Sequence, residues 1–312
     1  MPSCRRVILH ADDYGLSPAV SEGIRAGFER GLLTSTSVLS NAPDAARALG
    51  AWKSLAEARR GGGLPSSPRR RRLDDPGQDF DLGVHLNLTQ GRPLSGDRFP
   101  EELLDTAGRL PGIGRLARRL WTAGRRFAKA VEDELRRQIE FVLDHGRQPA
   151  HLNGHEYVEL LPAVGPIVAS LAAHFRIPAV RVAAETAWLG SLVRCGVAPR
   201  RWLIGGVKRS LARPLRRRLA AAGVHWPDAF FGGMSAGRVN LRQVRSFLAA
   251  AKRARLVEIV LHPGQSPAPG PLLPDGWCDA WADRRPEELR LVLSDELADV
   301  LDQAGCRLGR MA

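Results

Sequence analysis

The chain has 312 residues with 46 Lys and Arg against 33 Asp and Glu, which gives a formal net charge of +13. Only four of these bases are lysines, which indicates a compositional arginine bias more than a nucleic-acid-binding surface. A hydrophobic content of 44% excludes a wholly disordered chain. The cysteines lie far apart without a C-x-x-C pair, which excludes a thiolate zinc site and favours a reducing cytoplasm.

Short apolar runs alternate with helical patterns along the chain. Ser17-Pro18 predicts a helix start, with Val20, Ile24 and Phe28 on one face. Strands are expected at 6–10, 36–40, 81–88, 150–153, 179–182, 257–261 and from 307, and further helices at 129–143, 162–175 and 286–303. Repeated strand–helix units favour a parallel sheet covered by helices. We expect one α/β domain over 1–312 with a surface-loop insertion at 59–79, and no transmembrane helix.

Acidic and imidazole side chains stand near the ends of several predicted strands. They are Asp12, Asp13, His85, His151, His155 and His262. The carboxyl ends of parallel strands share one rim, so these groups should converge there. One Asp with two His makes a divalent-metal set, a second Asp can take a proton from the attacking water, and another His can protonate a leaving group. The alternative is structural: aspartates that cap helices and histidines that bond in loops.

An ordered set of motifs carries a family resemblance. The motifs are HADDYGLSP at 10–18, GLLTSTS at 31–37, GVHLNLT at 83–89, HLNGH at 151–155, HPG at 262–264 and RPEEL at 285–289. No single motif is decisive, but their order along nearly the whole chain resembles the YdjC-like carbohydrate deacetylases, which include chitooligosaccharide deacetylases. The resemblance implies a distorted (β/α) TIM-like barrel that removes the N-acetyl group from an acetylated amino sugar.

The resemblance also implies a role for individual residues. One divalent ion, Mg or Zn, would be held by Asp13, His85 and His155. Asp12 would be the general base and His262 the general acid. The side chains expected on the substrate side are Arg181, Tyr14 and Asn153, and Arg181 could also orient Asp12.

One segment departs from the family pattern. The family usually has H-x-D-x-H-x-H-x-H after the fourth strand, whereas this chain has Asn153, Tyr157 and Glu159 in place of an Asp and two histidines. The Asn also resembles a hopanoid-associated (HpnK-like) branch that acts on a lipid-linked amino sugar. The substrate is therefore open between an oligosaccharide and a glycolipid. A catalytically altered barrel that binds a glycan or lipid-linked sugar at a membrane surface is the alternative.

The stretch 200–218 holds eight basic residues and no acid. Leu203, Val207, Leu211, Leu215 and Leu219 recur every four residues, which predicts an amphipathic helix. Its leucines could pack on the barrel, or the helix could contact an anionic membrane or a lipid-linked substrate. No nucleic-acid recognition fold is expected. The sequence leaves a homo-oligomer open.

Two further motifs are weaker. The stretch 233–237 matches G-x-S-x-G, but the acid and histidine that a serine hydrolase needs downstream are poorly placed, so we interpret it as a loop lining the site. The stretch 155–159 resembles H-E-x-x-H but ends in Glu and follows a strand, which argues against a metalloprotease.

Overall fold

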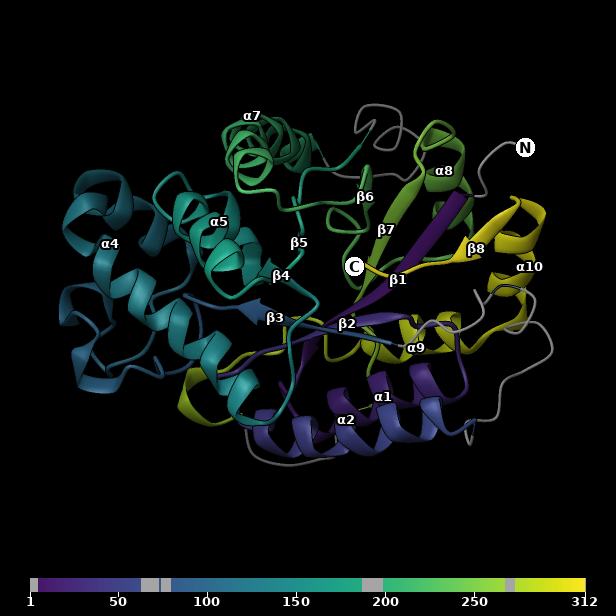
Figure 1. The fold of residues 1–312 in the computed structure, drawn as a ribbon, viewed down its shortest axis with the longest axis horizontal. Helices are drawn as coiled ribbons and strands as arrows, with labels where there is room; N and C mark the ends of the chain where they lie inside the picture. The colour runs from purple at the N-terminus through teal and green to yellow at the C-terminus, as the bar shows by residue number, and fades with distance from the viewer. Residues whose placement is uncertain (1–4, 63–72, 74–79, 187–198, 267–272, 312) are drawn as a thin grey trace.

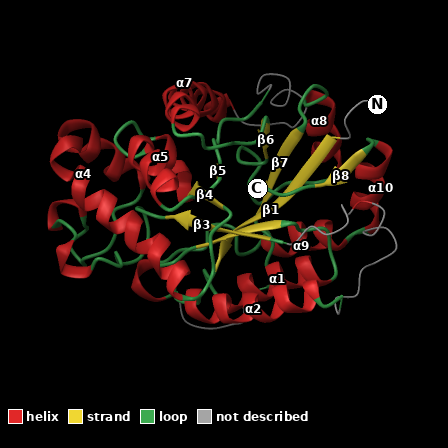
Figure 2. Cartoon of the chain, in the orientation of Figure 1, coloured by secondary structure: helices red, strands yellow, loops and turns green. Residues whose placement is uncertain are grey.

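The computed structural model describes residues 5–62, 73, 80–186, 199–266 and 273–311. Their strands form one parallel eight-stranded sheet, with helices packed outside it (Figures 1 and 2). The strands are β1 (Arg5–Tyr14), β2 (Ser35–Val38), β3 (Asp81–Leu86), β4 (His151–Gly154), β5 (Ala179–Val180), β6 (Ala229–Phe231), β7 (Leu256–Leu261) and β8 (Cys306–Leu308).

The sheet curls into a distorted barrel, as expected. The strand order is β5-β4-β3-β2-β1-β7-β6, and β8 pairs with the first residues of β1. The two ends of this path meet: Val180 donates its N–H to the His225 carbonyl over 2.9 Å, and Thr186 donates to the Phe230 carbonyl over 3.1 Å. His225 in turn donates its N–H to the Pro178 carbonyl over 2.9 Å, so three backbone hydrogen bonds join the two short end strands where regular pairing is missing.

The helices follow the apolar periodicity of the sequence. They are α1 (Pro18–Glu29), α2 (Ala45–Arg60), α4 (Ile113–Asp144), α5 (Gly165–His174), α7 (Pro199–Ala221), α8 (Leu241–Ala250), α9 (Arg285–Leu293) and α10 (Asp295–Gln303). Short 3-10 turns are η1 (Gly96–Arg98), η2 (Glu101–Leu103), η3 (His155–Leu160) and η4 (Pro274–Gly276). In Figure 1, α1, α2 and α9 lie along one side of the sheet, and α7 lies apart from them, above α5, which it contacts.

Three element boundaries differ most from the sequence prediction. β1 runs on to Tyr14, so both aspartates lie inside the strand instead of after it. α4 begins at Ile113 instead of 129, because buried Leu116, Leu120 and Phe127 extend its apolar face across a kink at Ala123. The helix expected at 286–303 is broken at Ser294, whose extended backbone and side chain cap α10.

Two expectations meet the limits of the described residues. Residues 59 and 60 of the expected insertion belong to α2, and most of 63–79 lies outside the described chain, although Leu73 is buried. In the part of the chain that is described, no helix is both long and apolar enough to span a membrane.

Candidate active site

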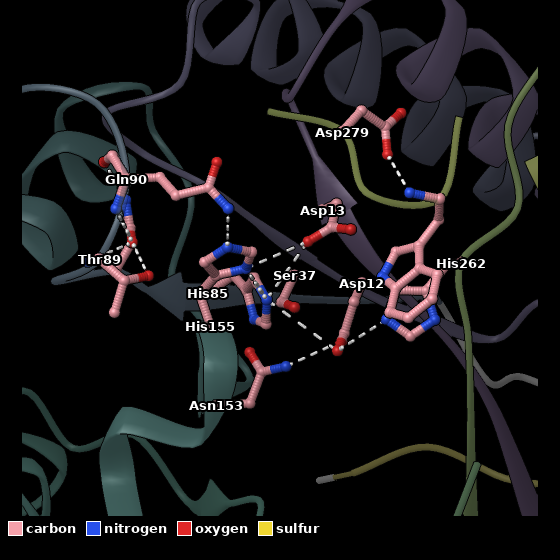
Figure 3. A network of polar contacts seen from close by, with 12 residues as sticks. Asp12, Asp13, Ser37, His85, Thr89, Gln90, Asn153, His155, His262 and Asp279 are labelled. Atoms are coloured by element: carbon pink, nitrogen blue, oxygen red, sulfur yellow. Dashed lines mark hydrogen bonds and ion pairs between the residues drawn. The ribbon is translucent and has the colours of Figure 1, made fainter. Parts of the chain in front are cut away.

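The candidate site lies at the carboxyl ends of β1, β3, β4 and β7. A cavity of about 410 Å³ there is lined by Asp12, Asp13, His85, His155 and His262 together. Figure 3 shows these side chains directed toward a common space. The structure therefore brings together all five residues predicted to bind metal or transfer protons.

A local irregularity of β1 lets two adjacent residues reach the same cavity. Neighbouring side chains of a regular strand point to opposite faces of the sheet. Asp13, however, has a left-handed backbone with φ 70°, and the pairing with β2 shifts register between Ala11 and Tyr14. Such a bulge re-aims side chains and is typical of the edges of active sites. It places Asp12 and Asp13 in one site.

Asp13, His85 and His155 form a cluster that could hold a metal ion. Asp13 Oδ1 lies 3.5 Å from His85 Nε2 and 3.4 Å from His155 Nδ1, and these two nitrogens are 3.3 Å apart. Ligand distances of about 2.1 Å in tetrahedral geometry put neighbouring ligand atoms about 3.4 Å apart. The three donors therefore fit one face of a tetrahedral site and leave the rest of the coordination sphere toward the cavity.

Asp13 is held by Arg285, the first residue of the RPEEL motif, to which the sequence assigns no role in the site. Arg285 Nη2 donates to Asp13 Oδ2 over 2.7 Å, and its Nε donates to Asp279. Burial alone would raise the pKa of Asp13, but Arg285 and the two histidines outweigh it and hold that pKa well below its usual range. Asp13 is thus an anion with one anchored oxygen and one oxygen facing the imidazoles.

Asp12 is anchored by a different group of donors. Arg181 Nη1 contacts both carboxylate oxygens, at 2.9 and 2.8 Å, and Asn153 Nδ2 donates to Oδ1 over 3.0 Å. Oδ2 lies 4.0 Å from His262 Nε2 and 4.0 Å from His85 Nε2 (Figure 3). Burial opposes ionisation, but Arg181 and His85 outweigh it, so the pKa of Asp12 is well below its ordinary value.

His10 completes the support of Asp12 from beneath. Burial and Arg181 lower its pKa to about 3, so the imidazole is neutral. Its Nε2 lies 3.1 Å from Asp12 Oδ1 and its Nδ1 lies 3.0 Å from Ser35 Oγ. A carboxylate can only accept a hydrogen bond, so we place the proton on Nε2, and Ser35 donates to Nδ1.

None of the three side chains expected to bind substrate lines the cavity. Tyr14 is buried, and its hydroxyl donates to the Ala48 carbonyl over 2.7 Å beside Trp52, because the bulge directs it away from the site. That prediction is wrong for Tyr14. Asn153 is fully buried and reaches the site only through Asp12. Arg181 likewise contacts Asp12; its Nε donates to Glu258 Oε1 over 2.7 Å, and its Nη2 lies within ion-pair distance of the same oxygen.

His262 stands at the end of β7. It lies on the opposite side of the cavity from Asp13, His85 and His155, which we call the metal-type cluster. Its backbone N–H donates to Glu288 Oε2, which fixes the start of the following loop. Its ring centre lies 6.0 Å from that of Trp281, another residue lining the cavity. Nδ1 is buried and has no hydrogen-bond partner within the described chain.

The segment that departs from the family pattern forms the strained turn η3. Glu156 and Tyr157 both adopt left-handed backbone conformations, with φ of 50° and 66°. The Tyr157 hydroxyl donates to the Gly233 carbonyl over 2.8 Å, and Lys208 of α7 lies over its ring. Glu159 is fully buried below them.

Several other cavity or neighbouring residues were missed by the sequence. Gln90 Nε2 lies 3.1 Å from His155 Nε2, and Trp277 lies beside the same ring. The loop at 233–237 joins the lining through Ala236, while the Oγ of its Ser235 accepts a bond from Gln243, so no serine-hydrolase arrangement forms there. A tryptophan or glutamine in an irregular loop carries no periodic signal, which is why only the structure finds these neighbours.

Fold and site together define an α/β barrel with a candidate Asp-His-His metal centre at its carboxyl rim. The chain belongs to the YdjC-like protein family, whose model matches residues 6–303. It is 30% identical to a carbohydrate deacetylase of Mus musculus over 97% of this chain and 93% of that one. It is 26% identical to a carbohydrate deacetylase of Geobacillus stearothermophilus, over 97% and 96% of the two chains.

Two more similarities support the same fold and family. A chitooligosaccharide deacetylase of Serratia marcescens is 29% identical over 53% of this chain and 55% of that one. A crystal structure from Enterococcus faecalis V583, of a protein whose name proposes cellobiose-phosphate cleavage, matches 99% of this chain and 98% of its own, with a TM-score of 0.69 and 19% identity. At that identity the match establishes the barrel fold alone.

Proposed function

We propose that this protein is a metal-dependent hydrolase that removes the acetyl group from an N-acetylated amino sugar. The relatives named as carbohydrate deacetylases support the reaction, and the convergence of Asp13, His85 and His155 carries the metal dependence. A divalent ion held by these three residues supplies Lewis-acid polarisation of the amide carbonyl and lowers the pKa of a water molecule. Either Mg or Zn is proposed, and the three-donor spacing favours Zn.

The protein's own groups move the protons. Asp12 accepts the proton of the attacking water at Oδ2, the oxygen that has fewer donors and faces the cavity. His262 donates a proton to the departing amine nitrogen, since its Nε2 lies on the far side of Asp12 from the metal-type cluster. Arg181 and His10 hold Asp12 in the required orientation and keep it ionised.

The cavity wall favours an acceptor with an apolar part. Away from the charged cluster, the lining is mostly apolar and includes Ile113, Leu160, Leu161, Ile204 and Leu211. A plain oligosaccharide would leave its hydroxyl groups against this wall without hydrogen-bond partners, which costs free energy. We therefore propose that the amino sugar carries an apolar aglycone, as a glycolipid does.

Helix α7 extends this apolar surface out of the cavity. Leu203, Ile204 and Val207 are 76%, 46% and 58% exposed, whereas Leu215 and Leu219 at the other end of the helix are buried. Only the C-terminal half of α7 therefore packs its leucines on the barrel. The exposed half favours the proposal that 200–218 makes peripheral contact with a membrane where such a substrate resides. The cytoplasmic location expected from the sequence stays a prediction.

Acetate release tests the reaction and the acceptor together. The purified protein is incubated with chitooligosaccharides and with an N-acetylglucosaminyl lipid, with Zn or Mg added or with a chelator. We expect release that depends on metal and is faster on the glycolipid. Faster release from the oligosaccharides would overturn the apolar acceptor but not the hydrolase. Binding of either sugar without any release, at full metal occupancy, would instead support the catalytically altered binding barrel.

A further inference from the structure

A second cavity lies on the opposite side of α7 from the candidate active site. Its volume is about 630 Å³, and Arg209, Ser210, Arg213 and Arg216 of α7 line it. These arginines follow the spacing i, i+4, i+7, so they share one helix face. The residues of α7 that line the catalytic cavity, Ile204, Lys208 and Leu211, repeat the same spacing on another face. The two cavities therefore share α7 as a common wall.

The three arginines of this second cavity have no counter-ion in the described part of the chain. No carboxylate there lies within ion-pair distance of Arg209, Arg213 or Arg216. Among the described residues, the one hydrogen bond from their side chains is a long one, from Arg209 Nη1 to the backbone carbonyl of Glu185 over 3.4 Å. Three cations thus line one concave surface, and no carboxylate of the described residues pairs with them.

The two acids that line this cavity bond elsewhere. Asp228 Oδ2 accepts the backbone N–H groups of Arg255 and Leu256, over 2.8 and 2.9 Å. Glu185 Oε1 accepts the N–H of Met234 over 2.7 Å, and burial raises the pKa of its carboxyl. The chain from 187 to 198, which joins this cavity wall to α7, contains no Asp or Glu in its sequence.

Arg216 shows the electrostatic cost of this arrangement. Its Nε is buried and has no hydrogen-bond partner within the described chain. Burial, followed by repulsion from Arg209, lowers the pKa of its guanidinium. A guanidinium nitrogen withdrawn from water without a partner is costly unless an anion satisfies it, although Arg216 as a whole is half-buried and Arg209 and Arg213 are exposed. The cavity is therefore prepared for a ligand that brings negative charge and several acceptor oxygens.

We propose that the cavity formed by Arg209, Arg213, Arg216 and Ser210 binds a phosphate group. A phosphate offers more negative charge and more acceptor oxygens than a carboxylate, and arginine forks match its geometry. The Ser210 hydroxyl lies on the same helix face, where it donates to the Gly206 carbonyl over 3.3 Å. The group can come from free phosphate or from a phospholipid headgroup, because both present the same oxygens to these donors.

Two probes and a matched control test this site. Calorimetric titration with inorganic phosphate, at an ionic strength held constant with chloride, is run on the whole protein and on the variants R213Q, R216Q and R218Q. Arg218 is an exposed arginine of the same helix that does not line the cavity. The same four proteins are co-sedimented with phosphatidylcholine vesicles, with and without phosphatidic acid.

We expect R213Q and R216Q each to weaken binding about tenfold while R218Q leaves it unchanged, because each loses charge-assisted bonds. Saturable binding of free phosphate shows that the soluble ion suffices, and specific binding to phosphatidic-acid vesicles alone identifies the headgroup as the source. Equal weakening in all three variants, no weakening in R213Q and R216Q, or no binding of either probe overturns the site. Without phosphate, R216Q should unfold at or above the wild-type temperature, which separates lost binding from lost folding.

Discussion

Asp12 and Asp13 are neighbours in the chain, yet they belong to two differently built halves of the site. Each is paired with its own buried arginine, Arg181 for Asp12 and Arg285 for Asp13. On the Asp13 side, the free oxygen meets two imidazole nitrogens at 3.4 and 3.5 Å. On the Asp12 side, the oxygen that faces the cavity lies 4.0 Å from His262 Nε2 and 4.0 Å from His85 Nε2.

This difference shows how two identical side chains can divide the chemistry. Asp13 Oδ1 lies close to two imidazole nitrogens, and the three atoms together suit a metal ion. Asp12 Oδ2 is farther from its neighbours, which leaves room for a water molecule that gives up a proton. The arginines do not distinguish the two halves, since both keep their aspartate ionised. The distinction lies in the second oxygen of each carboxylate and in what faces it.

Removal of Asp13 should have the largest effect. In D13A the metal loses an anionic ligand, and we expect acetate release to fall on the order of 10⁴-fold. Metal content of the purified variant, measured by mass spectrometry, should fall with it. D279N, which changes only the outer partner of Arg285, serves as the control and should lose about tenfold. A D13A protein that retains its full metal content would remove Asp13 from the ligand set.

Substitution of Asp12 should separate proton transfer from metal binding. In D12N the general base is lost while the cluster on the other side is intact, so kcat should fall about 10³-fold with unchanged metal content. N153A, which removes one donor to Asp12, should reduce kcat far less. If D12N lost its metal as D13A does, the two halves would not be separate in function.

The two arginines should differ in their effect on stability. R181M leaves Asp12 and Glu258 buried without their cation, and we expect it to lower the free energy of unfolding by about 3 kcal/mol. R285M leaves Asp13 and Asp279 without their cation. The Asp279 side chain is 15% exposed, so water can partly replace the lost bonds. Urea denaturation should therefore show the larger loss for R181M. A larger loss for R285M would contradict this dependence on burial.

The sequence predicted the residues that line the site better than the backbone and ion pairs that position them. Parallel strands bring their carboxyl ends to one rim, so residues near those ends can be predicted to lie together. The sequence predicted this for the five residues that line the cavity, which are Asp12, Asp13, His85, His155 and His262. The bulge at Asp13 could not be predicted, since no local sequence pattern distinguishes an aspartate with a left-handed backbone inside a strand. The wrong assignment of Tyr14 follows from that same bulge.

The ion pair that holds Asp13 was also beyond the sequence, whereas the family resemblance had suggested that Arg181 orients Asp12. Arg285 lies 272 residues from Asp13, in a helix start that is unremarkable among 46 basic residues. The fold was predicted better, since strand–helix alternation and the family motifs both indicated the barrel. Helix ends were less accurate, because the break at Ser294 depends on a side-chain cap within an otherwise continuous apolar pattern.

The smallest expected effect concerns Glu159, a fully buried residue of η3 that stands where the family usually has histidine. Burial is the main cause that raises its pKa from 4.5 to about 7. The folded protein therefore holds this proton more tightly than the unfolded chain does, and that stabilisation is lost as the pH rises toward and through 7. As the pH rises from about 5.5 to about 8, ionisation of Glu159 should lower the free energy of unfolding of the wild type by about 2 kcal/mol.

E159Q removes the titration, so its stability should fall less than that of the wild type over the same pH range. Urea midpoints at pH 5.5 and 8 measure the difference, with E156Q as the control, because Glu156 is exposed on the same turn. Metal content and acetate release should be unchanged in E159Q if Glu159 only supports the turn. An identical pH dependence in E159Q and the wild type would show that this carboxyl ionises normally, and a loss of activity would instead move Glu159 into the site.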